Sequence, residues 1–165
     1  MVSLFTDVIT GDDMFSSAFL MKQVDNIVYE VDCQMVTVKK AATTDFDADD
    51  STEEEGVKVV NNVVETFGLQ ETTFNKASYL SNFKGYIKRI HDHLEVNAPD
   101  QVEEFQKNVN LYIKKIVSRF KDYEFYTGSS MNAEGMIALL GYRPDGIQPY
   151  FTFWKHGLNA TELKE

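Results

Sequence analysis

Alternating apolar and polar residues open the chain, and this pattern is typical of β-strands. A short apolar run at residues 2–5 comes first, and NIVYEVDCQMVTV (26–38) alternates over its whole length. The odd-numbered apolar positions of this run should face the core: Ile27, Tyr29, Val31, Cys33 and Met35. The pair Asp25-Asn26 is typical of a turn before this run. Residues 57–74 are rich in β-branched side chains and predict one or two further strands.

The apolar period changes at residues 76–121, where apolar side chains recur three or four positions apart. The first such stretch contains Tyr79, Leu80, Phe83, Tyr86, Ile87, Ile90 and Leu94. The second contains Val102, Phe105, Val109, Tyr112, Ile113, Ile116, Val117 and Phe120. Asn97-Ala98-Pro99 separates them, and Asn75 or Ser78 could cap the first. The pattern predicts an antiparallel hairpin of two helices, each of about 20 residues and about 30 Å long.

The last part of the chain returns to strand-like segments. YEFYTG begins at Tyr123, GMIALLGYR follows, and a turn at Pro144-Asp145-Gly146 leads to YFTFWKHG. We therefore predict an α+β fold in a single domain, residues 1–165, with a mainly antiparallel β body. The β body comprises residues 1–40, 57–74 and 123–158, the helical hairpin residues 76–121, and a mobile acidic loop residues 41–56.

Composition indicates a globular, cytoplasmic protein. The chain is 43% hydrophobic and 13% aromatic, and it contains no apolar run near the ~18 residues that cross a bilayer. Its N-terminus lacks the basic start of a secretion signal, and Asp7 interrupts the apolar stretch. A lone cysteine, Cys33, excludes an internal disulfide and a multi-cysteine zinc site, and its position in the alternating run predicts a buried core residue. We expect no membrane insertion and no zinc.

Charge is unevenly distributed. Segment 76–121 contains nine of the 16 basic residues and five of the 26 acidic ones, so its net charge is +4 within a chain of −10. The rest of the chain therefore carries −14. An acidic body thus presents one basic element, and the two faces should attract different partners.

The stretch TTDFDADDSTEEEG (43–56) raises the question of calcium. Its alternating aspartates resemble an EF-hand loop, but position 6 would be Asp50 rather than glycine, and position 12 would be Gly56 rather than glutamate. Two interpretations stay open: a solvated flexible loop, or a weak calcium site. The candidate ligands are Asp45, Asp47, Asp49 and Asp50.

Motifs for catalysis are missing. The glycines form no phosphate-binding loop, no serine lies in a G-x-S-x-G turn, and His91 and His93 are two apart on a predicted helix, so their side chains diverge. Both histidines should be exposed polar residues. The sequence predicts a binding protein rather than an enzyme.

Several long motifs follow one another along the chain: DVITGDDM (7–14), VVNNVVETFGLQETTF (59–74), FKGYIK (83–88), FKDYEFYTGSSMNAEGMIALLGYRPDG (120–146) and WKHGL (154–158). In order and spacing they resemble the translationally controlled tumour protein family, also called histamine-releasing factor or fortilin, and residues 120–146 resemble its second signature. The resemblance implies a β-tent fold with an inserted helical hairpin and a mobile acidic loop. The chain departs from the family pattern in the acidic loop, at Asp13 and at Ser129.

The resemblance also implies a cytosolic protein with several partners. It implies weak binding of calcium. The implied protein partners are tubulin and microtubules, the translation elongation machinery and ribosome, and factors of cell survival. Direct nucleic-acid binding is not expected, because the aromatics of the hairpin lie on its apolar stripe. Tubulin is acidic, so the basic hairpin is its expected site: Lys84, Lys88, Arg89, Lys107, Lys114, Lys115, Arg119 and Lys121.

An alternative function comes from the same resemblance. The family's proposed contact with a Rheb-like small GTPase corresponds here to Asp12, Asp13 and Gly128, which predicts an exchange factor or dissociation inhibitor. A third reading, a reductase remnant using Cys33, is disfavoured by the position of this residue in the predicted core.

Overall fold

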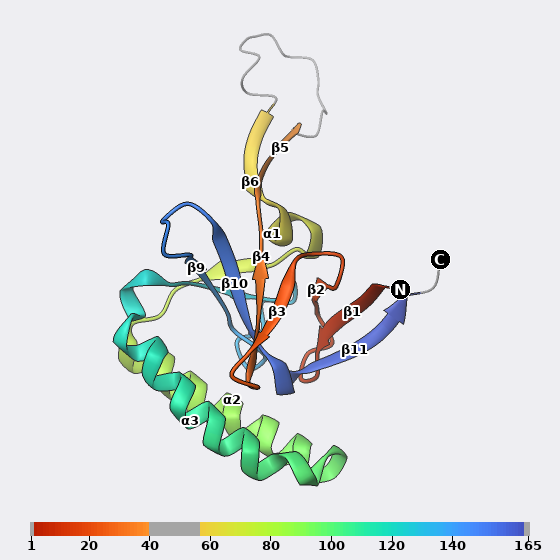
Figure 1. Cartoon of the computed structure of the whole chain (residues 1–165), viewed down its shortest axis with the longest axis vertical. Coiled ribbons are helices and arrows are strands. Elements are labelled where there is room, and N and C mark those ends of the chain that lie inside the picture. Colours follow the sequence, from red (N-terminus) through yellow and green to blue (C-terminus); the bar gives the residue numbers. More distant parts are fainter. Residues whose placement is uncertain (1, 40–56, 164–165) are drawn as a thin grey trace.

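The computed structural model describes residues 2–39 and 57–163. Within these residues the chain forms three antiparallel sheets and a long helical hairpin, which lies along one side of the sheets (Figure 1). The predicted α+β fold with its antiparallel sheets and helical hairpin is confirmed. The predicted mobile acidic loop lies outside the described residues.

The largest sheet supports the hairpin. Its strands follow the order β3 (Met21–Val24), β4 (Val28–Asp32), β10 (Pro149–Trp154), β9 (Ala138–Tyr142), β8 (Glu124–Thr127) and β7 (Gln70–Thr72). The central strand β10 is buried at every position, so it reads as a continuous apolar run rather than an alternating one. Positive φ angles at Asp25 and Asn26, 55° and 53°, confirm the predicted turn between β3 and β4.

Two smaller sheets complete the body. One joins β11 (Leu158–Leu163), β1 (Val2–Asp7) and β2 (Asp13–Ser16), and the other pairs β5 (Met35–Lys39) with β6 (Val57–Asn61). The pairing of β1 with β11 brings the two ends of the chain side by side, and the β5–β6 ribbon projects from the body (Figure 1).

The helical hairpin consists of α2 (Lys76–Asn97) and α3 (Val102–Ser118), joined by a 3₁₀ turn at Pro99–Gln101. Asn75 caps α2 through a reciprocal box: its side chain accepts from the Ser78 backbone at 2.8 Å, and its own backbone N–H donates to the Ser78 hydroxyl at 3.0 Å. These bonds satisfy N–H donors that have no partner inside the helix. A second 3₁₀ turn, Phe120–Asp122, leads from α3 into β8.

The apolar stripes of both helices pack on the sheet through aromatic side chains. Trp154 of β10 lies between Phe83 of α2 and Tyr112 of α3, with ring centroids 5.5 and 5.8 Å away. Gly157 permits a close approach, because a Cβ there would lie 1.9 Å from the Tyr86 hydroxyl. The hairpin is therefore fixed to the body along its whole apolar face, and only its outer face is free.

Residues 57–74 correct the sequence prediction. They contain β6 and β7, but a helix, α1 (Asn62–Phe67), separates the two strands. Asn61 caps α1 by accepting from the backbone of Val63 and Val64, and Gly68 ends it at φ 71°. Local capping thus overrides the β preference of the valines.

Three further predictions need correction. The alternating run breaks after Cys33, so Met35 begins a new strand and is 53% exposed, while Val28, an even-numbered residue, is fully buried. Strand β11 extends beyond the predicted end of the β body at residue 158, and its exposed residues gave no alternating signal. His91 and His93 are half-buried rather than exposed.

The C-terminal turn follows prediction. Gly146 has φ 74°, and the Asp145 side chain accepts from the backbone of Ile147 and Gln148 at 2.8 and 3.0 Å. These two bonds lower the pKa of the Asp145 carboxyl. No helix in the described residues has the length and apolarity required to cross a membrane.

Candidate functional site

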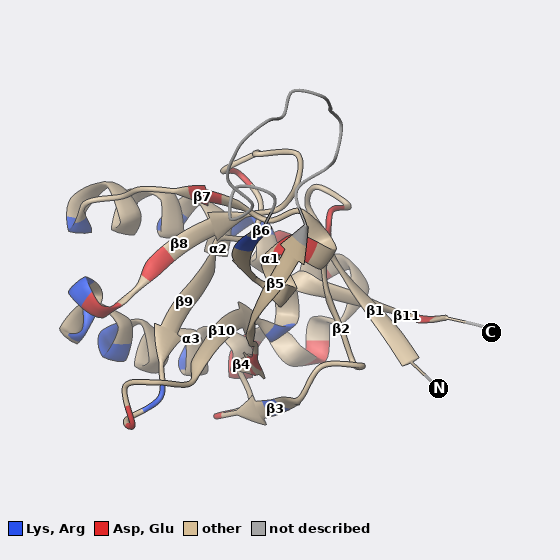
Figure 2. Cartoon of the chain, turned by 90° about the horizontal axis from the view of Figure 1, so that it is seen from above, with Lys and Arg blue, Asp and Glu red and all other residues tan. Residues whose placement is uncertain are grey.

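The charges of the helical hairpin are separated along its length. Because α2 and α3 are antiparallel, the start of α2 lies beside the end of α3. Five basic residues gather at this end, which we call the basic end: Lys76, Lys114, Lys115, Arg119 and Lys121. Figure 2 shows Lys and Arg on both helices here. The opposite tip contains Asp92, Glu95, Asp100, Glu103 and Glu104. The hairpin is therefore a dipolar element rather than a uniformly basic one.

Helix electrostatics favour this separation. Glu103 and Glu104 lie in the first turn of α3, and Lys115 lies in the last. Acidic side chains at a helix N-terminus and basic ones at its C-terminus each contribute about 0.3–1 kcal/mol. The arrangement therefore stabilises α3 while it concentrates positive charge at one end of the hairpin.

The eight basic residues predicted as a binding surface fall into two groups. Four interact within the protein: Lys88 with Asp92, Lys115 with Asp25, Arg119 with Asp122, and Arg89 with the Glu134 carbonyl. The other four are exposed and make no ion pair with any described residue: Lys84, Lys107, Lys114 and Lys121. Lys107 and Lys114 are seven residues apart, so they share one outward face of α3, and Lys121 lies beyond the helix in the following 3₁₀ turn.

The residues predicted for GTPase contact come together where Asp12, just before β2, packs against Gly128, just after β8, and Gly128 is buried rather than exposed. A Cβ on Gly128 would lie 2.4 Å from Asp12 Oδ2, so a glycine is needed here to leave room for the Asp12 side chain. Asp12 Oδ2 accepts from the Ser130 hydroxyl at 2.6 Å and from its backbone at 3.3 Å. Asp12 is half-buried and already bonded, whereas Asp13 is exposed. Of the two carboxylates, Asp13 is therefore the one available to a partner.

A buried carboxylate that sequence reasoning missed lies next to this site. Asp7, 2% exposed, ends β1 and accepts from the backbone of Ile9 at 2.8 Å and Met136 at 2.7 Å. A Cβ on Gly135 would lie 2.4 Å from its Oδ2. Asp7 thus fixes the loop between β8 and β9 to the first strand, and its hydrogen bonds compensate its burial.

Metal binding has one candidate group among the described residues. His91, Asp92 and Glu95 on α2 offer ligand atoms that lie within 4.8 Å of one another. His91 Nε2 lies 3.9 Å from Glu95 Oε2, and His91 Nδ1 lies 3.7 Å from Asp92 Oδ1. His93 is not part of this group. The predicted calcium ligands, Asp45, Asp47, Asp49 and Asp50, lie outside the described residues.

Cys33 is a buried core residue, as its sequence position predicted. It is 1% exposed, and the Asn61 side-chain amide donates to its Sγ at 3.1 Å. Burial raises the pKa of its thiol to about 11. Because the thiolate is the reactive form of cysteine, burial and this raised pKa make Cys33 a poor nucleophile.

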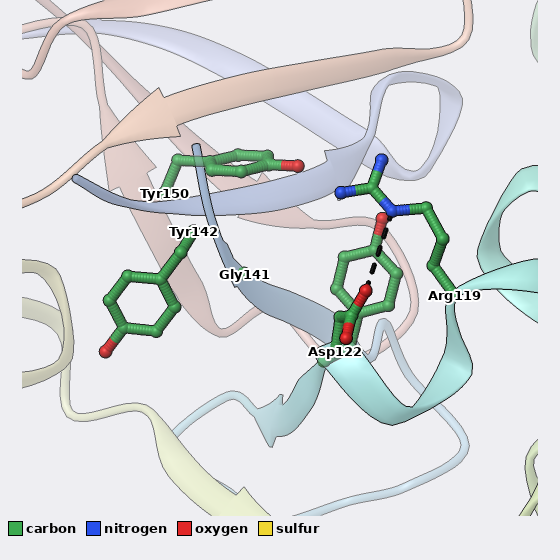
Figure 3. Close-up of a pocket in the computed structure, with 6 residues that line it drawn as sticks. Arg119, Asp122, Gly141, Tyr142 and Tyr150 are labelled. Carbon is green, nitrogen blue, oxygen red and sulfur yellow. Dashed lines mark ion pairs between the residues drawn. The ribbon is translucent and has the colours of Figure 1, made fainter. Parts of the chain in front are cut away.

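A small hollow adjoins the basic end. We call it the tyrosine pocket: it has a volume of about 190 Å³ and is lined by Arg119, Asp122, Tyr123, Gly141, Tyr142 and Tyr150. Figure 3 shows Arg119 and Asp122 on one side of Gly141 and Tyr142 on the other. These residues come from the segment 119–123 that follows α3 and from β9 and β10, so no single sequence motif contains them.

Comparison with known proteins is consistent over nearly the whole chain. The sequence profile of the family described as "Translationally controlled tumour protein" matches residues 2–159. A "Translationally-controlled tumor protein homolog" of Yarrowia lipolytica is 51% identical, covering 97% of this chain and 99% of the relative. One from Schizosaccharomyces pombe is 48% identical, covering 94% and 96%.

Solved structures agree with these sequence matches. A structure titled "Translationally Controlled Tumor-associated Protein" from Schizosaccharomyces pombe has a TM-score of 0.86 and 47% identity, covering 99% of this chain and all of the other. A structure titled "Translationally-controlled tumor protein" from Caenorhabditis elegans has a TM-score of 0.71 and 27% identity, with full coverage of both chains. The resemblance seen in the sequence motifs is thereby confirmed.

Proposed function

Because the chain belongs to the translationally controlled tumour protein family, we propose that it is a non-enzymatic, cytoplasmic binding protein whose basic end attaches to acidic protein surfaces. Tubulin and microtubules are the partners that we place first. The observation behind this proposal is the charge separation in the hairpin. Lys114 and Lys121 are exposed at the basic end without an ion-pair partner among the described residues. They are free to meet carboxylates of a partner.

The small free energy of a single exposed ion pair means that several lysines must bind a partner together. An exposed ion pair contributes about 0.2–1 kcal/mol, so no single lysine can hold a partner. Several lysines on one face can, and clustered charge also raises the association rate. The proposal therefore predicts binding that is distributed over the basic end and sensitive to salt.

Co-sedimentation with microtubules tests the proposal. Lys114→Glu combined with Lys121→Glu should weaken binding about tenfold, because two attractive contacts become repulsive. Raising the salt should weaken wild-type binding as the screening length falls below about 10 Å. The matched control is Lys22→Glu with Lys58→Glu, which reverses two exposed lysines outside the hairpin. Equal loss in both double variants, or salt-insensitive binding, would contradict the assignment.

The other functions implied by the family have less support from the structure than binding of tubulin. We propose association with the translation elongation machinery and ribosome, a role in cell survival and cytoskeletal localisation through the same acidic-partner binding. Weak calcium binding by Asp45, Asp47, Asp49 and Asp50 stays part of the proposal. Amide NMR during calcium titration tests it: shifts confined to residues 41–56 would support the loop, and shifts at His91 and Glu95 would move the site to α2.

A second candidate function is regulation of a Rheb-like GTPase. It is favoured by one observation: Asp12 packs against the buried Gly128, and the next residue, Asp13, is exposed beside this contact. Release of labelled GDP from such a GTPase should change when the protein is added, and Asp13→Asn should remove the effect. Unchanged release at micromolar protein would exclude the exchange role.

A further inference from the structure

The tip of the hairpin opposite the basic end contains a group of metal-ligating side chains that the proposed function does not use. His91, Asp92 and Glu95 all lie on α2, where side chains three or four residues apart are neighbours on the helix surface. One ligand atom from each residue lies within 4.8 Å of the other two. A single helix therefore brings the group together, and no loop has to pack for it to form.

The imidazole of His91 is the most firmly held member of this group. Its side chain is 26% exposed, whereas those of Asp92 and Glu95 are 60% and 57% exposed. Nδ1 lies 3.7 Å from Asp92 Oδ1, and Nε2 lies 3.9 Å from Glu95 Oε2, both beyond hydrogen-bond distance. The ring is thus half-buried in place, while the two carboxylates remain free to move toward a cation.

The spacing of the ligand atoms is close to that around a bound ion. Zinc lies about 2.1 Å from nitrogen and oxygen ligands in a tetrahedral site, which places two ligand atoms about 3.4 Å apart. His91 Nε2 and Glu95 Oε2, 3.9 Å apart, would close by only about 0.5 Å. Asp92 must also leave Lys88, but that ion pair is 3.5 Å long and exposed, so it is weak.

The donor set selects the class of ion. Calcium takes six to eight oxygen ligands, and two carboxylates supply too few of them. An imidazole nitrogen suits zinc, copper and nickel, and zinc accepts three protein ligands of the histidine and carboxylate type with water in the fourth position. The lone cysteine of the chain excluded a multi-cysteine zinc site, but this group needs no cysteine.

We propose that His91, Asp92 and Glu95 bind a divalent transition-metal ion of the nickel, copper and zinc series. One imidazole nitrogen and one oxygen from each carboxylate hold the ion, and water completes its coordination. Asp100, Glu103 and Glu104 at the same tip of the hairpin add negative charge that attracts a cation. This site is separate from the basic end, so it does not rest on the proposed binding of acidic partners.

Isothermal titration calorimetry on the untagged full chain tests the proposal, with Zn²⁺, Ni²⁺ and Ca²⁺ as separate titrants in a buffer that does not chelate them. Zn²⁺ and Ni²⁺ should each bind at least about tenfold more tightly than Ca²⁺, because the imidazole favours them. Amide NMR then locates the ion: the first additions of Zn²⁺ should shift the signals of residues 88–98.

Variants of α2 provide the matched comparison. His91→Ala should weaken Zn²⁺ binding at least about tenfold, since loss of a group that only orients a ligand already costs about 10–100-fold. Glu95→Gln should act in the same direction, and its exposed position keeps the test valid if His91→Ala perturbs the helix. His93→Ala is the control: His93 is half-buried on the same helix, its Nδ1 lies 3.2 Å from Asn97 Nδ2, and it is not part of the group.

The outcomes distinguish this site from the basic end. Equal losses in His91→Ala and His93→Ala, Ca²⁺ binding as tight as that of Zn²⁺, or Zn²⁺ shifts that avoid residues 88–98 would each overturn the proposal, as would the absence of Zn²⁺ binding. Lys114→Glu with Lys121→Glu should retain full Zn²⁺ affinity, whatever its effect on microtubule binding. His91→Ala should in turn leave microtubule binding unchanged, so each proposal can fail without the other.

Discussion

His156 gives the sharpest test of how the hairpin is held to the body. It lies in the 3₁₀ turn Lys155–Gly157 after β10, and its ring packs edge-to-face on Phe105 of α3 with centroids 5.0 Å apart. The side chain is 8% exposed, and its Nδ1 has no hydrogen-bond partner in the described part of the chain. Burial, reinforced by the charge of Lys155 and opposed by Glu104, lowers the pKa of His156 to about 4.

The sign of the pH effect follows from this lowered pKa. The unfolded chain binds a proton on His156 below pH ~6.5, whereas the folded chain does so only below about 4. Between these values the unfolded state binds more protons, so the free energy of unfolding falls as pH falls, by about 1.4 kcal/mol per unit. From about pH 7 to about pH 5 the loss amounts to about 2 kcal/mol.

Urea denaturation followed by fluorescence measures this effect, because Trp154 is the single tryptophan of the chain and is buried beside the hairpin. His156→Phe cannot take up a proton and retains a ring against Phe105. Its stability relative to wild type should increase by about 2 kcal/mol between pH ~7 and pH ~5. Both proteins share all carboxylates, so their titration cancels in the difference. A difference that is constant with pH would refute the reasoning.

Three other predictions follow from single contacts. Cys33 should react with a thiol reagent only after urea unfolding, since its thiol is buried with a pKa of about 11. If the folded protein were labelled as fast as an exposed thiol, this prediction would be wrong. Gly128→Ala should lower the free energy of unfolding by about 1–3 kcal/mol through its clash with Asp12, and Asp12→Gly in the same chain should recover part of that loss. Asn61→Ala should cost about 1–2 kcal/mol in chemical denaturation, because α1 loses its cap and the Cys33 contact disappears; a cost under about 0.5 kcal/mol would refute this role for the cap.

Elements with a strong period were predictable from the sequence. The apolar spacing of residues 76–121 predicted α2 and α3, because each helix buries a stripe of apolar residues at this spacing. The sequence also indicated Asn75 and Ser78 as candidate caps, and both residues take part in the observed capping box of α2. Periodicity succeeds where one face of an element is buried along its whole length.

Elements without a buried face were not predictable. Strand β11 is exposed at almost every position and exists because its backbone pairs with β1, more than 150 residues earlier in the chain. Helix α1 was missed because the β-branched Val63 and Val64 favour strand, whereas Asn61 and Gly68 decide the outcome by capping. In both cases hydrogen bonds to specific partners, rather than side-chain period, set the structure.

The candidate site, too, was predictable from the sequence only in part. The excess of basic residues in the hairpin could be counted in the sequence, but their separation from Asp92, Glu95 and Glu103 matters only once the antiparallel packing places Lys76 near Arg119. The tyrosine pocket combines residues 119–123 with residues 141–150, and only the pairing of β8, β9 and β10 brings these segments together. Residues that strand pairing brings together have no characteristic spacing in the sequence, so no motif identifies them.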